Sequence, residues 1–259
     1  MSGTDLRIVG ALAGRSVKQT FRRPQLMAPL IVFPTLLLAI QTAGAGRAVD
    51  LPGFPEVNGF LDFMLAGAMI QSTLLAGNAG GIALAVDIEM GFTDRLLAAP
   101  IPRYAIVAGR LAGTAVLGLF TAIWFLAIGV IFGVTFTEGV AGVLLMIAFV
   151  VGSALTFGTI GAGIALRTGS ASVVQGMFPL VFVILFVSTA FFPEDLLLEP
   201  ARTMAEYNPL SFIVDATRDP VISAFSVDGL LKGLLGLAII GCLGMLFVAR
   251  ALRHRVRVG

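Results

Sequence analysis

Six long apolar runs dominate this chain, and more polar links separate them. A helix that crosses a bilayer needs about 20 mostly apolar residues. Over 259 residues the chain is 58% hydrophobic and 12% charged, whereas soluble domains are about 25% charged. We therefore expect an all-α polytopic membrane protein, a single transmembrane domain over residues 1–259. The expected spans lie at about 25–43, 60–86, 108–134, 139–166, 172–192 and 229–249.

The first 23 residues predict a helix of another kind. Apolar side chains recur at helical spacing from Leu6 to Phe21, and Arg7, Arg15 and Lys18 fall on the opposite face. A basic amphipathic helix of this kind lies in the membrane interface. We expect an interfacial helix over 1–23. A solvated basic tail is the alternative, which the length of the apolar stripe disfavours.

Residues 193–228, between the last two runs, fit neither a span nor an ordinary loop. They carry too many charges to cross a bilayer, yet they hold the apolar stretches 196–198, 212–214 and 221–225. Two short helices that enter one leaflet and return would satisfy both features, provided that protein covers their backbone. The segment therefore predicts a re-entrant helical hairpin.

Charge asymmetry gives the orientation. With six spans, one side of the membrane receives 13 of the 17 basic residues and only four of the 15 acidic ones. Basic residues stay cytoplasmic, so both termini and the link 87–103 are expected inside, and 193–228 outside. We expect a multi-pass protein of the inner (plasma) membrane.

The residues for catalysis or for ATP hydrolysis are missing from the sequence. It has one cysteine, Cys242, and one histidine, His254, so neither a metal site nor a catalytic set is expected. Its only lysines are Lys18 and Lys232, and no phosphate-binding G-x-x-x-x-G-K-[ST] motif occurs. Ionisable residues fall near span ends, which disfavours an ion-gradient carrier without excluding it. We expect no nucleic-acid partner, and an energy source on a separate cytoplasmic subunit.

The polar stretch 87–103 predicts a handle for such a subunit. Residues 89–99 can form about three helical turns, with Phe92, Leu96 and Ala99 on one face. Pro100 and Pro102 end the helix before the third span. The alternative is a tight loop without a partner.

Two short motifs resemble those of type-two ATP-binding-cassette (ABC) export permeases, and the likeness extends over essentially the whole chain. The first, the coupling-helix signature, is an acidic residue followed by Gly, a Leu-Leu pair and Pro: Glu89, Gly91, Leu96, Leu97 and Pro100. The second is Asn208-Pro209-Leu210 followed by Val214-Asp215-Ala216 and Arg218. The closest similarity is to the daunorubicin-resistance branch of drug and lipid exporters.

This resemblance implies a permease dimer, of identical or related chains, that works with two cytoplasmic ATPase subunits. ATP and Mg would bind those subunits, and this chain would bind no cofactor and be no enzyme. The resemblance assigns ATPase coupling to Glu89, Gly91, Phe92, Asp94, Arg95, Leu96 and Pro100. It assigns the substrate pathway, at the dimer interface, to Gln71, Asn78, Phe178, Phe182 and Phe186. It assigns the external hairpin motif to Asn208, Pro209, Asp215 and Arg218.

Composition bears on the cargo. The chain has 20 Phe but one Trp and two Tyr, and a cavity of Phe, Leu and Met suits an apolar or amphiphilic cargo. We expect export of drugs or lipids. Export of a polysaccharide or glycolipid through the same architecture, an ion-gradient carrier and a regulatory subunit without a pathway are the alternatives.

Overall fold

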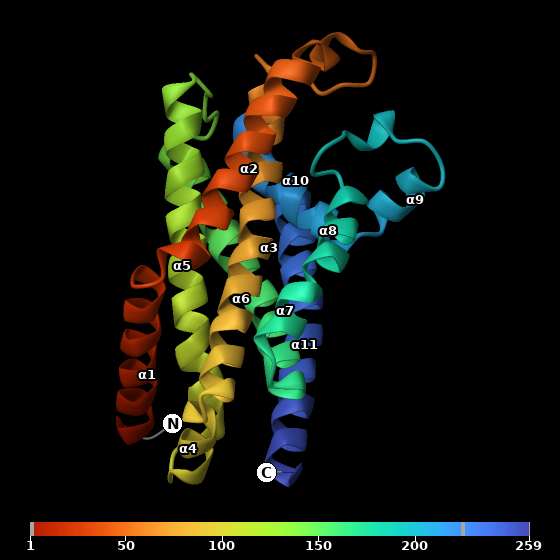
Figure 1. The fold of residues 1–259 in the computed structure, drawn as a ribbon. Coiled ribbons are helices and arrows are strands. Elements are labelled where there is room, and N and C mark those ends of the chain that lie inside the picture. Colours follow the sequence, from red (N-terminus) through yellow and green to blue (C-terminus); the bar gives the residue numbers. More distant parts are fainter. Residues whose placement is uncertain (1–2, 224–225, 259) are drawn as a thin grey trace.

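The computed structural model describes the backbone of residues 3–223 and 226–258, with all side chains in it except those of residues 4, 26, 178, 181 and 256–258. Throughout this part of the chain the regular structure is helical, and no strand occurs. Five helices form an elongated bundle (Figure 1): α2 (Pro24–Ala45), α3 (Phe60–Glu89), α5 (Arg103–Ile131), α6 (Gly139–Thr168) and α11 (Val227–Val258). These five segments are long and apolar enough to cross a membrane. They confirm five of the six expected spans.

Shorter elements fill the gaps between these helices. They are α1 (Gly3–Phe21), η1 (Gly46–Asp50), α4 (Phe92–Ala98), α7 (Ala171–Gly176), α8 (Phe178–Phe186), η2 (Glu194–Leu196), α9 (Ala201–Glu206) and α10 (Pro209–Ile222). Both labelled chain ends and α4 lie at one end of the bundle, here called the lower end as drawn in Figure 1. The loops around η1 and α9 lie at the upper end.

The expectation that 172–192 forms a sixth span is not confirmed. The chain there forms α7 and α8 and then turns from residue 187 to 192, so no continuous helix reaches spanning length. The break falls at Met177, just before Phe178-Pro179. Proline has no backbone N–H, and its ring restricts the preceding residue, so a helix rarely continues through such a site.

Helix α3 is the centre of the bundle. In its most apolar window 94% of the residues are buried, against 17% for α2 and 22% for α11. Glycines allow α6 to pack directly against it: a Cβ atom on Gly77 would lie 2.6 Å from the backbone of Phe157, and one on Gly81 would lie 2.8 Å from that of Gly161. Small residues permit this close approach of two backbones, which is how membrane helices gain packing contacts.

Helix α1 is confirmed as a helix, but its orientation differs from the expected one. It runs alongside the lower half of α5 instead of across the lower end of the bundle (Figure 1). Gly109 of α5 lies against Leu12, and Gly113 lies against Ser16. The amphipathic pattern predicted the helix, whereas these glycines provide the groove that sets its direction.

Within its described residues, the expected hairpin over 193–228 contains the short helical elements η2, α9 and α10, of which α10 is the most buried. Leu210, Ile213 and Val214 are buried, and α10 packs against α3, α6 and α11. Protein therefore covers its backbone, as partial entry into a bilayer requires. Helix α9 projects from the side of the bundle (Figure 1).

Candidate functional site

The short helix α4 joins α3 to α5 at the lower end and matches the predicted handle. Gly91 makes the turn from α3 with a φ of +68°, in the left-handed region that favours glycine. The chain is extended at Ala99 and resumes as α5 after Pro102. The expected bounds 89–99 were too wide, because α3 continues through Glu89 and the helix ends at Ala98.

The apolar face of α4 was expected to point toward an ATPase, but it points toward the bundle. Phe92 and Leu96 are partly buried and line a hollow toward α1, α3 and α5. The guanidinium of Arg15 lies 3.7 Å from the centroid of the Phe92 ring, which is a cation–π contact. The surface that α4 leaves exposed is formed by Asp94, Arg95 and Ala98, with Met90 just before the helix.

A buried ion-pair cluster lies directly above α4. Asp87 of α3 accepts hydrogen bonds from Arg15 at 2.8 and 3.2 Å, and it also pairs with Arg110 of α5. Arg110 donates in addition to Gln19 Oε1 at 3.2 Å. Because a buried charge is tolerated only when it is paired, this cluster joins α1, α3 and α5. Sequence reasoning placed Asp87 and Arg110 near span ends and Arg15 on the interfacial helix, but it did not predict their pairing.

Two further polar contacts tie this end of the bundle together. Arg255 of α11 donates to Asp94 of α4 at 3.0 and 3.3 Å. Glu89 Oε1 accepts the backbone N–H of Ala171 at 2.8 Å, so the carboxylate sits at the first turn of α7. Glu89 and Asp94, both expected to contact an ATPase, therefore have partners within this chain.

The residues expected to line a pathway lie in different surroundings. Gln71 is 1% exposed in the middle of α3, and its Nε2 has no hydrogen-bond partner among the described atoms. Asn78, about two turns further along α3, is partly buried. Phe182 of α8 packs edge-on against Phe33 with ring centroids 5.7 Å apart.

The other two phenylalanines of α8 differ from each other. Phe186 is half exposed and stacks on Phe191 at 4.8 Å. The Phe178 side chain lies outside the described residues. Gln71 thus faces the interior of a single chain, whereas Phe186 lies on its surface.

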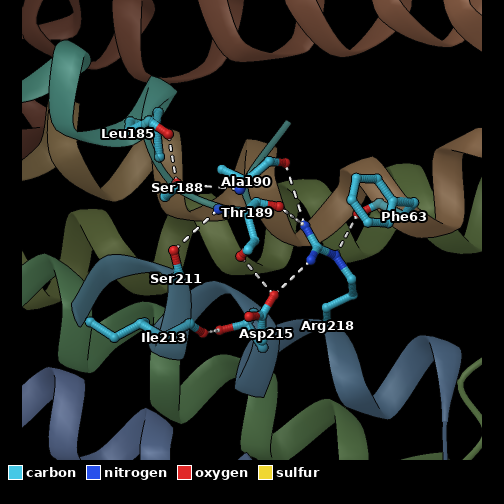
Figure 2. A network of polar contacts seen from close by, with 10 residues as sticks. Phe63, Leu185, Ser188, Thr189, Ala190, Ser211, Ile213, Asp215 and Arg218 are labelled. Atoms are coloured by element: carbon cyan, nitrogen blue, oxygen red, sulfur yellow. Dashed lines mark hydrogen bonds and ion pairs between the residues drawn. The ribbon is translucent and has the colours of Figure 1, made fainter. Parts of the chain in front are cut away.

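Asp215 and Arg218 of the motif at 208–218 belong to a polar network (Figure 2). Arg218 donates to the carbonyl oxygens of Phe63 at 3.1 Å and of Thr189 at 2.7 Å. It also pairs with Asp215 at 2.8 Å and lies 3.9 Å from the centroid of the Phe63 ring. Thr189 Oγ1 donates to the same Asp215 oxygen at 2.7 Å. The network fastens α10 to the first turn of α3 and to the turn after α8.

Asn208 and Pro209 shape the start of α10. Asn208 Oδ1 accepts the N–H of Leu210 at 3.0 Å as the N-cap, and Pro209 occupies the first turn. Asn208 Nδ2 donates to the carbonyl oxygens of Ile184 and Val187, both at 3.0 Å. One side chain therefore caps α10 and also satisfies two carbonyl groups at the end of α8.

Two cavities of about 350–360 Å³ lie next to these elements. The first adjoins the Arg218 network and has carboxylates and aromatic rings in its wall: Phe54, Phe63, Glu194, Asp195 and Asp215. The second is almost entirely apolar and is lined by residues of α3, α6, α8, α10 and α11, among them Leu74, Phe157, Ile240, Leu243 and Phe247. Both reach the lower size limit of small-molecule sites, about 300 Å³.

Comparison with known proteins gives one match. A family model described as "ABC-2 type transporter" matches residues 8–221, which covers the chain from α1 to the last turn of α10. A search of curated proteins finds no match. Among the described residues, no group of three or more His, Cys, Asp or Glu side chains could hold a metal ion.

Proposed function

The chain belongs to the ABC-2 type transporter family, and from this premise we propose which exporter it serves. The family makes it a membrane permease component that works with an ABC ATPase. We propose that it exports hydrophobic or amphiphilic drugs or lipids, as in the daunorubicin-resistance branch. Two permease chains and two ATPase subunits would form the working unit. Its place would be the inner (plasma) membrane, with both termini cytoplasmic.

The observation that carries the coupling part of this proposal is the way α4 is attached. The Phe92 ring lies under Arg15, and Arg15 shares Asp87 with Arg110. On its other side, α4 is held by the ion pair between Asp94 and Arg255. A force applied to α4 therefore reaches α1, α3, α5 and α11 through direct contacts. A helix outside the apolar spans and attached in this way is suited to transmit motion from a cytoplasmic motor.

The exposed side chains indicate how the ATPase would hold α4. Phe92 and Leu96 pack toward the bundle, so the contact with the ATPase would be made by Met90, Arg95 and Ala98. An exposed methionine beside a cation offers both apolar burial and charge complementarity. This assignment replaces the apolar stripe as the surface that enters the ATPase cleft.

The nature of the cargo is supported by the apolar cavity and by the surface of α8. The cavity of about 360 Å³ between α3, α6, α8, α10 and α11 has almost no polar wall, which favours apolar groups. On α8 the side chains of Leu180, Val183, Ile184 and Phe186 are exposed. We propose that this face meets the second permease chain, and that cargo moves between α3 and α8 of the two chains.

The test reconstitutes the chain with its ATPase in proteoliposomes. Phe182→Asp is expected to abolish the stimulation of ATP hydrolysis by drug or lipid while the ATPase still co-purifies, since an aspartate opposes burial of an apolar cargo. Phe132→Asp is the matched control, because Phe132 follows α5 at the upper end and is 72% exposed. Unchanged stimulation in the Phe182 variant would contradict the pathway.

The coupling surface is tested separately in the same preparation. Met90→Asp combined with Arg95→Glu is expected to release the ATPase during purification. The control Arg47→Glu changes the charge of the helical turn η1 at the upper end of the bundle. Normal co-purification of the double variant would refute the assignment of this surface.

A further inference from the structure

A small polar niche between α1, α3 and α5 remains unexplained by the transport mechanism. Its polar wall is formed by Ser16, Gln19, Thr20, Arg23, Arg110 and Thr114. Its enclosed part measures about 20 Å³, which is room for one water or one oxygen atom of a larger group. Apolar side chains, Met27 and Leu117, continue the wall toward the upper end.

The niche contains hydrogen-bond donors without partners. The Thr114 hydroxyl is buried, at 1% exposure of the residue, and makes no hydrogen bond among the described atoms. Arg23 lines the niche, and its guanidinium makes no ion pair or hydrogen bond within the described part of the chain; only its backbone N–H is bonded, to Thr20 O at 3.3 Å. An unpaired buried hydroxyl costs free energy, so the site is chemically incomplete without an acceptor.

The charge of the surroundings has the sign that an anion requires. Arg15 and Arg110 share the single carboxylate of Asp87, and Arg23 adds a third guanidinium to the same region. The cations thus exceed the anions by two. Guanidinium groups bind phosphate oxygens with strong, charge-assisted hydrogen bonds.

The position along the bundle points to a lipid as the source of the phosphate. The first apolar span begins at Met27, four residues above Arg23, and four helical residues rise about 6 Å. Arg23 therefore lies at the edge of the hydrocarbon layer, where phospholipid headgroups are found. Lys18 and Arg22 are exposed on the adjoining part of the chain and add attraction for an anionic leaflet.

We propose that this niche binds the phosphate of an anionic phospholipid from the leaflet at the lower end of the bundle. One phosphate oxygen would accept from Thr114, and Arg23 would pair with the phosphate charge. The acyl chains would run past Met27 along α2 and α5. The bound lipid would fill the gap between α1 and the bundle and hold α1 against α5. The proposal depends on the membrane location and not on the cargo or the ATPase.

The test uses the purified full chain, delipidated in a neutral detergent, and follows its melting midpoint during titration. Dioleoyl phosphatidylglycerol is expected to raise the midpoint in a saturable way. Dioleoyl phosphatidylcholine and inorganic phosphate are expected to do so far less. Arg23→Gln and Thr114→Val are each expected to raise the half-saturating concentration by about tenfold, since each removes a hydrogen bond to a charged group. Thr114→Val preserves the shape of the side chain, so it remains informative if Arg23→Gln folds poorly.

Arg22→Gln is the matched control, because it removes the same charge from an exposed neighbour that does not line the niche. It is expected to leave the half-saturating concentration unchanged. An equal loss in Arg22→Gln would show only general attraction to the basic surface and would overturn the proposal. Equal effects of phosphatidylcholine would exclude recognition of the anionic headgroup, and equal effects of inorganic phosphate would assign the niche to a free anion.

Discussion

Replacing Asp87 by Asn is the sharpest test of the ion-pair cluster that joins α4 to the bundle. The substitution keeps the size of the side chain and removes its charge. The Asp87 and Arg110 side chains are 3% and 7% exposed, so Arg110 would remain as a buried cation without a counter-charge. Breaking a buried pair from one side costs about 3–5 kcal/mol. A free-energy change of 1 kcal/mol moves the melting temperature by roughly 2–4 °C in a chain of this size, so we expect Asp87→Asn to lower it by about 6–20 °C.

Two controls separate burial from the mere presence of an ion pair. Arg15→Gln removes a partner that is 34% exposed and leaves Asp87 paired with Arg110. Asp94→Asn breaks the exposed pair with Arg255. Exposed pairs are worth about 0–1 kcal/mol, so Asp94→Asn should lower the melting temperature by at most about 4 °C. Arg15→Gln should lower it less than Asp87→Asn, because it leaves no buried charge without a partner.

The assay is thermal unfolding of the detergent-solubilised chain, followed by size-exclusion chromatography with fluorescence detection. The double variant Asp87→Asn with Arg110→Gln removes both charges and is expected to melt above the Asp87→Asn variant, because no unpaired buried cation remains. An Asp87→Asn variant within about 2 °C of the wild type, which is below 1 kcal/mol, would refute the reasoning. A double variant that melts below Asp87→Asn would refute it as well.

Two further substitutions test helix packing and the hairpin motif by the same melting assay. Gly81→Val should lower the yield of monodisperse protein and cost about 1–3 kcal/mol or more, because its Cβ would lie 2.8 Å from the backbone of Gly161. The control Gly10→Ala should be tolerated, because its Cβ would meet nothing within 4 Å. A tolerated Gly81→Val would contradict the close approach of α3 and α6. Asn208→Ala should cost about 1 kcal/mol for the lost cap and more for the two bonds to α8. Asn208→Asp retains the capping acceptor but cannot donate, so it should recover only the first part; equal melting of both variants would argue against the dual role.

Helix α4 shows how much of this region the local sequence pattern could predict. The prolines at 100 and 102 predicted the end of a short helix, and α4 ends before them. Its start was expected at residue 89, inside α3, and not after the turn at Gly91. The pattern also grouped Phe92 with Leu96, and both do share a side of the helix. Which way that side faces was decided by the hollow between α1, α3 and α5, because an apolar face packs equally well against a partner or against its own bundle.

The motif at 208–218 shows a different limit. Asn208 before Pro209 is a readable N-cap, but the two carbonyl groups of α8 that it also satisfies come from residues 184 and 187. Arg218 likewise finds most of its partners at Phe63 and Thr189, far from it in sequence. A buried guanidinium demands acceptors, but sequence alone does not say which carbonyl groups the fold will bring to it.

By itself, the sequence determined that this chain is helical and embedded in a bilayer, because continuous apolar runs have no other stable environment and backbone groups in lipid must bond within a helix. The motif order also identified the permease family that the family model matches. Tertiary structure decided the rest: the break at Met177, the upright packing of α1 against the glycines of α5, and the sharing of Asp87 by Arg15 and Arg110. These features depend on which helix faces meet in space. The hydropathy profile of the sequence does not distinguish between different arrangements of the same apolar helices.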